Sequence, residues 1–265
     1  MGETVAFPKH GPKAELADYA LFLHRLADKA DAVARQYFGA PLAVEQKADA
    51  SPVTLADQEI EMALVEAIRT HYPQHGIYGE ETARVNPEAS WQWVIDPIDG
   101  TRAFIAGKPT FTTLIAICYE GTPLLGIISQ PIKKERWLGG DSSQPLAQED
   151  LPDSFAEAMI ATTSMSYFSA SEMRAFRQLE QQTRSVLLNH DAYAFGLLAN
   201  GGVDIVVEAK LKPWDFAALV PIVEQSGGII TDWEGKPLTL ESDGRVLAAR
   251  DIALHAQAIG ILTTP

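Results

Sequence analysis

The sequence is poor in cysteine and in positive charge. Its 265 residues include one cysteine, Cys118, so no disulfide can form within the chain and no cysteine-based metal site is available. Lysine and arginine number 21 against 35 aspartates and glutamates, which gives a formal net charge of −14. Binding to nucleic acid or to an anionic membrane surface depends on clustered basic residues, so we expect neither partner.

The sequence also lacks a long apolar run. No stretch approaches the 18 or more consecutive apolar residues of a membrane-spanning helix. Residues 1–10 lack the charged and then apolar pattern of a signal peptide, so we expect a cytoplasmic protein. Hydrophobic residues make up 46% of the chain, which is enough for one large core or for two smaller adjoining ones.

The first half of the chain predicts two helices followed by strands. Apolar residues recur at helical spacing over 14–38 and again over 54–71, where Thr54 is the expected N-cap. Strand patterns cover 91–95, 111–119, 123–129 and 136–138. Glu120-Gly121 separates two of these strands and predicts a hairpin turn.

The second half predicts alternating strands and helices. Strand patterns cover 158–162, 185–188, 203–208 and 229–231, and helix patterns cover 170–180, 192–199 and 213–225. Such alternation is typical of an α/β fold with mixed sheets. A polar segment at 141–153 predicts a boundary between an N-terminal domain, 1–145, and a C-terminal domain, 146–265.

Six carboxylates stand at the ends of apolar elements rather than on a polar face: Asp57, Glu80, Glu81, Asp96, Asp99 and Asp215. Asp96 and Asp99 follow the strand at 91–95 and flank Pro97, and Gly100 comes next. Proline fixes one backbone angle and glycine permits a positive φ, so the two carboxylates can converge. Two carboxylates and an intervening carbonyl suit Mg²⁺, and the amides of Gly100 and Thr101 at a helix start suit a phosphate.

Each of these patterns also has a purely structural explanation. Asp-Pro-x-Asp-Gly is common in turns, where Asp99 would bond its own backbone. Adjacent acids such as Glu80 and Glu81 are common in solvated loops. Asp57 and Asp215 stand where acids are favoured at helix starts. Taken one motif at a time, both explanations remain open.

Three motifs in this order resemble the inositol monophosphatase family. They are Ile-Tyr-Gly-Glu-Glu at 77–81, Trp-Val-Ile-Asp-Pro-Ile-Asp-Gly-Thr at 93–101 and Trp-Asp-Phe-Ala-Ala at 214–218. The resemblance spans about residues 15 to 260. It implies a layered α-β-α-β-α sandwich with mixed sheets, as in the wider superfamily that includes fructose-1,6-bisphosphatase. It also implies a Mg²⁺-dependent phosphomonoesterase, with two or three ions per site, that forms a homodimer.

The resemblance assigns metal ligands residue by residue. Glu80, Asp96 and the Ile98 carbonyl would bind a first Mg²⁺. Asp96, Asp99 and Asp215 would bind a second, with Asp96 bridging. Glu80 would also help to hold a third ion through water. On this basis domain 1–145 carries most of the metal ligands, and domain 146–265 supplies Asp215 and the substrate contacts.

The resemblance also assigns catalytic and substrate-binding residues. Thr101, paired with Asp57, would orient the attacking water, and Glu80 would take part in catalysis. The amides of Gly100 and Thr101 would receive the phosphate. Glu208 stands seven residues before Asp215, where the family places a carboxylate that touches the leaving group.

Four further stretches resemble the histidinol-phosphate phosphatase members of the family: 72–77, 100–109 with 113–116, 193–199 and 207–215. We therefore predict hydrolysis of L-histidinol phosphate to histidinol and phosphate, a step of histidine biosynthesis. Glu208 can pair with an ammonium or accept hydrogen bonds from inositol hydroxyls, and Lys210 stands where many histidinol-phosphate phosphatases carry aspartate. The alternatives are an inositol-1-phosphate or broad sugar phosphatase and, from another class, a catalytically silent metabolite-binding protein.

Overall fold

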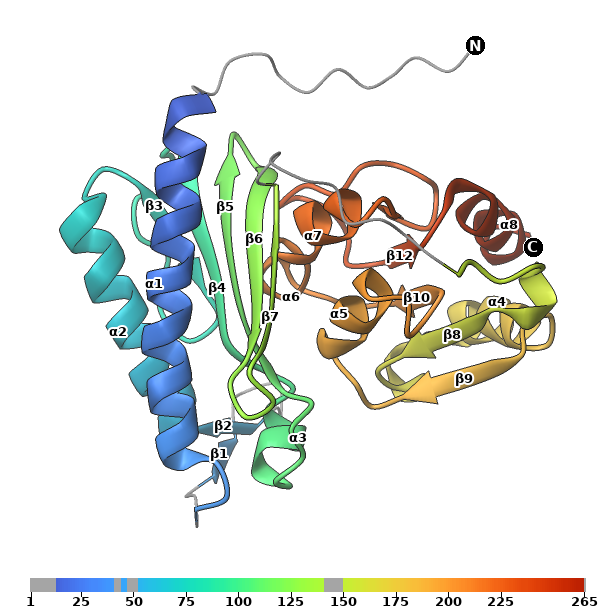
Figure 1. The fold of residues 1–265 in the computed structure, drawn as a ribbon, viewed down its shortest axis with the longest axis horizontal. Helices are drawn as coiled ribbons and strands as arrows, with labels where there is room; N and C mark the ends of the chain where they lie inside the picture. Colours follow the sequence, from blue (N-terminus) through green and yellow to red (C-terminus); the bar gives the residue numbers. More distant parts are fainter. Residues whose placement is uncertain (1–12, 41–43, 47–51, 141–149, 265) are drawn as a thin grey trace.

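The computed structural model describes residues 13–40, 44–46, 52–140 and 150–264 as five layers, helix, sheet, helix, sheet and helix (Figure 1). The α/β sandwich with mixed sheets predicted from the sequence is confirmed. The expected boundary at 141–153 lies largely outside the described residues, and the division into two domains stays a prediction. Within the described parts of the chain, no helix has both the length and the apolar character needed to cross a membrane.

The first sheet and the helix layer outside it come from the N-terminal half. The helices are α1 (Lys13–Tyr37) and α2 (Leu55–His71), which pack on one face of the sheet. The strands, in spatial order, are β3 (Gly76–Gly79), β4 (Trp91–Asp99), β5 (Thr112–Tyr119), β6 (Thr122–Gln130) and β7 (Glu135–Gly139). A small hairpin of β1 (Val44–Gln46) and β2 (Pro52–Thr54) precedes α2, and α3 (Thr101–Ile105) follows β4.

The second sheet and the remaining helices come from the C-terminal half. Its strands, in spatial order, are β11 (Ile229–Thr231), β12 (Val246–Ala249), β10 (Ile205–Glu208), β8 (Met159–Thr162) and β9 (Ser185–Leu188). The middle layer holds α5 (Tyr193–Ala199), α6 (Pro213–Phe216) and α7 (Leu219–Gln225). The outer layer holds α4 (Ala170–Glu180) and α8 (Ile252–Leu262), and short 3₁₀ turns occupy Phe155–Glu157 and Met165–Tyr167.

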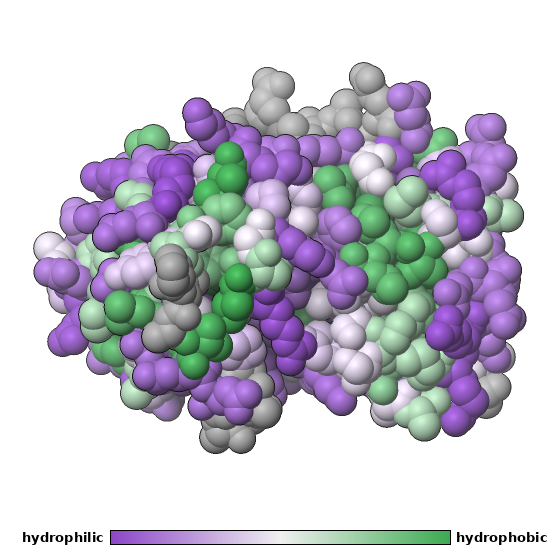
Figure 2. Space-filling model, turned by 90° about the horizontal axis from the view of Figure 1, so that it is seen from below, coloured by the Kyte–Doolittle hydropathy of each residue, from purple (hydrophilic) through white to green (hydrophobic). Residues whose placement is uncertain are grey.

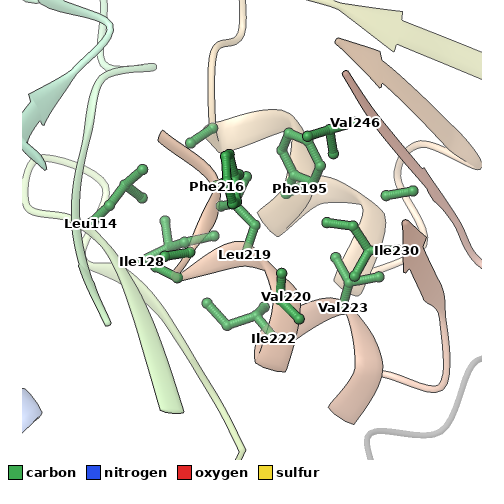
Figure 3. Packing of buried hydrophobic residues seen from close by; sticks show 14 of the residues in the cluster. Leu114, Ile128, Phe195, Phe216, Leu219, Val220, Ile222, Val223, Ile230 and Val246 are labelled. Atoms are coloured by element: carbon green, nitrogen blue, oxygen red, sulfur yellow. The ribbon is translucent and has the colours of Figure 1, made fainter. Parts of the chain in front are cut away.

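The central strands are apolar on both faces because each face meets a helix layer. On β5, Ile115 and Ile117 point into the core beneath α1 and α2, whereas Leu114 and Ala116 point into the core between the sheets. Successive strand residues point to opposite faces, so a sheet covered on both sides needs an unbroken apolar run. Figure 3 shows the core between the sheets, where Leu114 and Ile128 face the middle layer at Phe216, Leu219 and Ile222.

Two glycines allow the middle layer to lie close to the first sheet. A Cβ at Gly139 of β7 would stand 2.2 Å from the backbone nitrogen of Ile222, and one at Gly126 of β6 would stand 2.2 Å from the carbonyl oxygen of Ala218. Both contacts are with backbone atoms, which cannot turn aside as a side chain can. Glycine at these positions therefore sets the distance between α7 and the sheet.

Two sequence predictions of element bounds are wrong. The helix predicted at 213–225 is two helices, α6 and α7, separated at residues 217–218. Pro221 explains the second start, because proline has no amide hydrogen for an intrahelical bond and is tolerated in the first turn of α7. The strand predicted to stop at residue 95 continues to Asp99, so the expected turn at 96–99 is irregular strand instead.

Candidate active site

The ends of three elements bring the predicted carboxylates together. Asp96 and Asp99 lie at the end of β4, and Asp215 lies in the first turn of α6, which packs against β4. One oxygen from each of these three side chains lies within 4.8 Å of the others. Because β3 runs parallel to β4, its end delivers Glu80 to the same edge of the sheet, where the Glu80 amide donates to the Ile95 carbonyl at 3.2 Å.

An irregularity in β4 lets Asp96 and Asp99 face the same pocket. In a regular strand, residues three apart point to opposite faces. Between these two residues the pairing with β5 shifts, so that Asp96 lies opposite Leu114 and Asp99 opposite Thr112. The Thr113 hydroxyl donates to the Pro97 carbonyl at 2.8 Å within this irregular segment. A bulge of this kind redirects a side chain, and here it aligns two carboxylates.

Backbone and hydroxyl donors fix Asp99 in place. Its Oδ2 accepts hydrogen bonds from the Ala192 amide at 2.7 Å and from the Thr112 hydroxyl at 3.4 Å. The Thr112 side chain is itself buried beside the site. The donors on Asp99 come from the neighbouring strand and from the segment before α5, so both halves of the chain hold this carboxylate.

Gly100 turns the chain from β4 into α3. Its φ of +80° lies in the left-handed region that favours glycine, as the sequence predicted. A Cβ at this position would also stand 2.9 Å from Oδ2 of Asp191. Gly100 therefore allows both the turn and the close approach of Asp191, a residue that the motifs did not identify.

The pocket at this edge has a volume of about 430 Å³ and is strongly acidic. Its lining includes six carboxylates: Glu80, Asp96, Asp99, Asp191, Glu208 and Asp215. Three basic side chains also line it, Arg102, Lys210 and Lys212, so the lining has a formal charge of −3 when every group is ionised. Hydrophilic residues lie along the boundary between the two halves in the view from the α3 end of the molecule (Figure 2).

Burial and mutual repulsion make the ionised forms of these carboxylates unfavourable. Burial, together with the neighbouring carboxylates, raises the pKa of Asp96 and of Asp99 well above the usual range. Burial also raises the pKa of Asp215 to about 7, although the Lys212 amide donates to it at 2.7 Å. The buried Oδ1 of Asp96 has no hydrogen-bond partner. A divalent cation would supply the missing partner and charge, and a set made of carboxylate oxygens fits Mg²⁺.

Thr101 and Asp57 meet as the resemblance implied. The Thr101 hydroxyl lies 3.4 Å from Asp57 Oδ1 and 3.1 Å from the Ile98 carbonyl, and its single proton can bond one of them at a time. Asp57 Oδ2 accepts from the amide and the hydroxyl of Thr54 at 2.8 and 2.5 Å. Burial raises the pKa of Asp57, and the bonds from Thr54 oppose that shift. Thr54, at the start of α2, therefore fixes the position of Asp57 next to Thr101.

Glu208 is buried at the end of β10. Its Oε1 accepts from the amide and the hydroxyl of Thr163 at 2.6 and 2.8 Å, and Oε2 lies 3.4 Å from the Thr162 hydroxyl. Burial raises the pKa of Glu208 to about 8 despite these bonds. Lys210, two residues further on, is exposed and also lines the pocket.

Two carboxylates near the site were missed by the sequence analysis, and one predicted acid lies apart. Asp191, which lines the pocket, follows β9 in a loop, and its backbone has a φ of +44°. Glu61 is buried on α2 and accepts from the amides of Glu81 and Thr82, both at 2.8 Å. Glu61 lies four residues after Asp57 on the buried face of α2, a spacing that could have found it. Glu81 is not among the described residues that line the pocket.

Known proteins resemble the chain over nearly its whole length. A model of the inositol monophosphatase family matches residues 15–263. The chain is 43% identical to "Bifunctional phosphatase IMPL2, chloroplastic" of Arabidopsis thaliana, over 95% of this chain and 77% of that protein. It is 32% identical to a histidinol-phosphatase of Chlorobaculum parvum, over 84% and 89% respectively.

One solved structure is similar to this chain in both fold and sequence. A structure of an inositol monophosphatase from Zymomonas mobilis superimposes with a TM-score of 0.85 at 43% identity, covering 94% of this chain and 98% of that one. The fold, the acidic pocket and these matches define the protein as a phosphoric monoester hydrolase. It belongs to the inositol monophosphatase family, as the three motifs indicated.

Proposed function

We propose that the protein is a Mg²⁺-dependent phosphatase that hydrolyses L-histidinol phosphate to histidinol and phosphate. The observation that carries this proposal is that two carboxylates outside the expected metal ligands, Asp191 and Glu208, line the same pocket. Histidinol differs from a sugar alcohol in carrying an ammonium group, which such carboxylates bind well. Relatives named histidinol-phosphatase, one of them 32% identical over 84% of this chain, support the same substrate.

The proposed metal ligands are those that the motifs indicated. Asp96, Asp99, Asp215 and Glu80 all line the pocket, and so does Ile98. Bound Mg²⁺ supplies the positive charge that neutralises these carboxylates and the substrate phosphate, and that makes water a better nucleophile at neutral pH. Two ions would change the formal charge of the lining from −3 to +1, so phosphate binding is expected to depend on metal.

The protein's own groups position the reactants. Thr101 and Asp57 orient the attacking water: the threonine hydroxyl accepts a hydrogen bond from that water while it donates to the carboxylate or to the Ile98 carbonyl. The amides of Gly100 and Thr101, at the start of α3, donate to phosphate oxygens. Fixed donors at these places cost no reorganisation when charge develops during the reaction.

The leaving group is recognised next to the phosphate, where Asp191 lies beside Gly100. Thr163 holds Glu208 in one orientation through two hydrogen bonds, and burial favours the neutral form of its carboxyl group. An ammonium group beside Glu208 and Asp191 lowers the pKa of both carboxyl groups and so stabilises their ionised forms. Inositol has hydroxyls in place of this cation, so its hydrogen bonds to these carboxylates lack the attraction between opposite charges.

A second candidate is hydrolysis of inositol-1-phosphate or of a range of sugar phosphates. The Zymomonas mobilis structure at 43% identity is of an inositol monophosphatase, and Glu208 can accept hydrogen bonds from hydroxyls. Lys210 adds a positive charge to the pocket, which disfavours a cationic substrate. A location in the cytoplasm, assembly as a homodimer and a place in histidine biosynthesis remain predictions from the sequence.

The test compares kcat/KM for L-histidinol phosphate and inositol-1-phosphate in one Mg²⁺ buffer. We expect a preference of at least about tenfold for histidinol phosphate, the size of one charge-assisted contact. Asp191→Asn is expected to lower kcat/KM for histidinol phosphate and to leave inositol-1-phosphate little changed. Asp153→Asn, an exposed acid outside the pocket, is the control. A preference of the wild-type protein for inositol-1-phosphate would replace the first substrate with the second candidate.

A further inference from the structure

A second recess lies beside α1 and α2, apart from the acidic pocket. Its volume is about 480 Å³, and it shares no lining residue with the acidic pocket. It is bounded by the start of α1, the end of α2 and the start of β4. Six of its lining residues are aromatic or acidic: Glu15, Asp18, Tyr19, Tyr72, His75 and Trp91.

The aromatic rings that line this recess pack against one another in two orientations. The Tyr19 ring meets those of Tyr72, His75 and Trp91 at interplanar angles of 66°, 66° and 56°, with centroids 5.1 to 5.8 Å apart. His75 is nearly parallel to Tyr72 and to Trp91, at 16° and 18°. Tyr19 and His75 are buried, whereas Tyr72 and Trp91 are half-buried. The half-buried pair is therefore the part of the ring cluster that a ligand can reach.

The charge on this recess is negative. Glu15, Asp18 and Tyr19 stand on one face of α1, at the spacing that brings residues together on a helix surface. Glu15 and Asp18 are exposed, and Glu15 accepts a hydrogen bond from the Tyr19 hydroxyl at 3.3 Å. No lysine or arginine is among the described residues that line the recess. An anion would therefore be repelled at this place.

His75 adds no positive charge. The Trp93 indole donates to its Nδ1 at 3.1 Å, so a neutral ring carries its proton on Nε2. Burial lowers the pKa of His75, which favours this neutral form. His71 and His75 do not share a helix face, because α2 ends at His71 and His75 is held within the aromatic cluster.

We propose that this recess binds a small organic cation, a molecule with an alkylated or primary ammonium group. Such a cation is attracted to the faces of tyrosine and tryptophan rings and to carboxylates at the rim of a site. A bare metal ion would need several fixed oxygen ligands, whereas the two carboxylates of this recess are both exposed. A neutral apolar molecule would gain nothing from Glu15 and Asp18. Rings and rim acids together favour the organic cation.

The test measures the binding of choline and of its neutral isostere, 3,3-dimethylbutan-1-ol, by titration calorimetry. The protein is kept with Mg²⁺ and inorganic phosphate, so that the acidic pocket is filled. The proposal predicts that choline binds at least about tenfold more tightly than the isostere, because only choline makes the cation–π contact. Equal binding of the two molecules, or no binding of choline at millimolar concentration, would overturn it.

Variants locate the binding. Glu15→Gln combined with Asp18→Asn, two exposed changes that should not affect folding, is expected to weaken choline binding about fivefold or more. Tyr72→Leu is expected to weaken it as well. Glu66→Gln, an exposed acid on α2 outside the recess, is the control and should bind choline as the wild type does. If Glu208→Gln removes choline binding while the rim variant keeps it, choline occupies the acidic pocket and the proposal is wrong.

Discussion

Replacing Gly79 with alanine is expected to disturb the segment that carries Glu80. A Cβ at Gly79 would stand 2.0 Å from Oε1 of Glu61, far closer than real carbon–oxygen contacts. Glu61 cannot simply turn aside, because the amides of Glu81 and Thr82 and the Thr82 hydroxyl all donate to it, at 2.8, 2.8 and 2.6 Å. Either the buried carboxylate or the chain at 79–82 must move.

The size of the effect follows from these three hydrogen bonds. A hydrogen bond to a charged group contributes about 1.5–3 kcal/mol, so weakening one or two predicts a loss of about 2–4 kcal/mol in the free energy of unfolding. The same movement displaces Glu80, one of the proposed metal ligands. Mutation of a residue that orients a metal ligand typically lowers metal affinity by about 10- to 100-fold. We therefore expect the Mg²⁺ concentration for half-maximal activity to rise by about tenfold or more.

Two assays measure these effects. Urea unfolding of the metal-free protein gives the change in stability, and phosphate release against Mg²⁺ concentration gives the change in metal dependence. Gly260→Ala is the matched control, because a Cβ there meets no atom within 4 Å and the position lies in α8. Alanine in a helix is expected to add up to about 1 kcal/mol of stability at that site. If Gly79→Ala matches Gly260→Ala in both assays, the clash with Glu61 is refuted.

Three further predictions test other parts of the structure. Thr101→Val and Asp57→Asn should each lower kcat by about 100-fold or more in stopped assays of phosphate release. The double variant should lose little more activity than either single variant. Additive losses in the double variant would mean that the two residues act separately. Because burial raises the pKa of Glu208 to about 8, the folded protein binds a proton there that the unfolded chain has lost, so its contribution to stability falls as the pH rises from about 4.5 to 8. Glu208→Gln should remove this dependence from urea midpoints of the metal-free protein, and an unchanged pH profile would contradict the assignment. Gly139→Ala should lower the free energy of unfolding by about 2 kcal/mol or more, because its Cβ would meet the Ile222 backbone at 2.2 Å; a midpoint equal to that of the wild type would show that α7 can move away.

The sequence predicted most of the architecture because both sheets are covered by helices. Continuous apolar runs predict buried strands, apolar residues at helical spacing predict helices, and glycines predict the turns between them. Burial on both faces limits how such strands and helices can pack. The hairpin at Glu120-Gly121 is confirmed, with φ values of +48° and +78° between β5 and β6. No element was predicted beyond residue 231, and β12 and α8 were missed. In α8 eight of the eleven residues are apolar, so its amphipathic spacing is weak.

The site was predicted less completely than the fold. A single motif at 93–101 identified Asp96 and Asp99. The bulge that aligns their side chains depends on pairing with Leu114 and Thr112 of β5, and the sequence around Asp96 does not encode that pairing. Asp191 approaches Gly100 from a loop more than 90 residues further along the chain, so no spacing rule connects the two. Contacts of this kind become visible only when the tertiary structure brings distant segments together.

The central claim is that the carboxylates at the end of β4 hold the Mg²⁺ on which phosphate release depends. Its most direct test is the Mg²⁺ dependence of phosphate release from L-histidinol phosphate by the wild-type protein and by Asp96→Asn, with Asp153→Asn as the control. The account predicts that the wild type and the control are inactive after metal removal and recover with Mg²⁺, whereas Asp96→Asn has no measurable turnover at any Mg²⁺ concentration. Near-wild-type turnover of Asp96→Asn at saturating Mg²⁺ would contradict it.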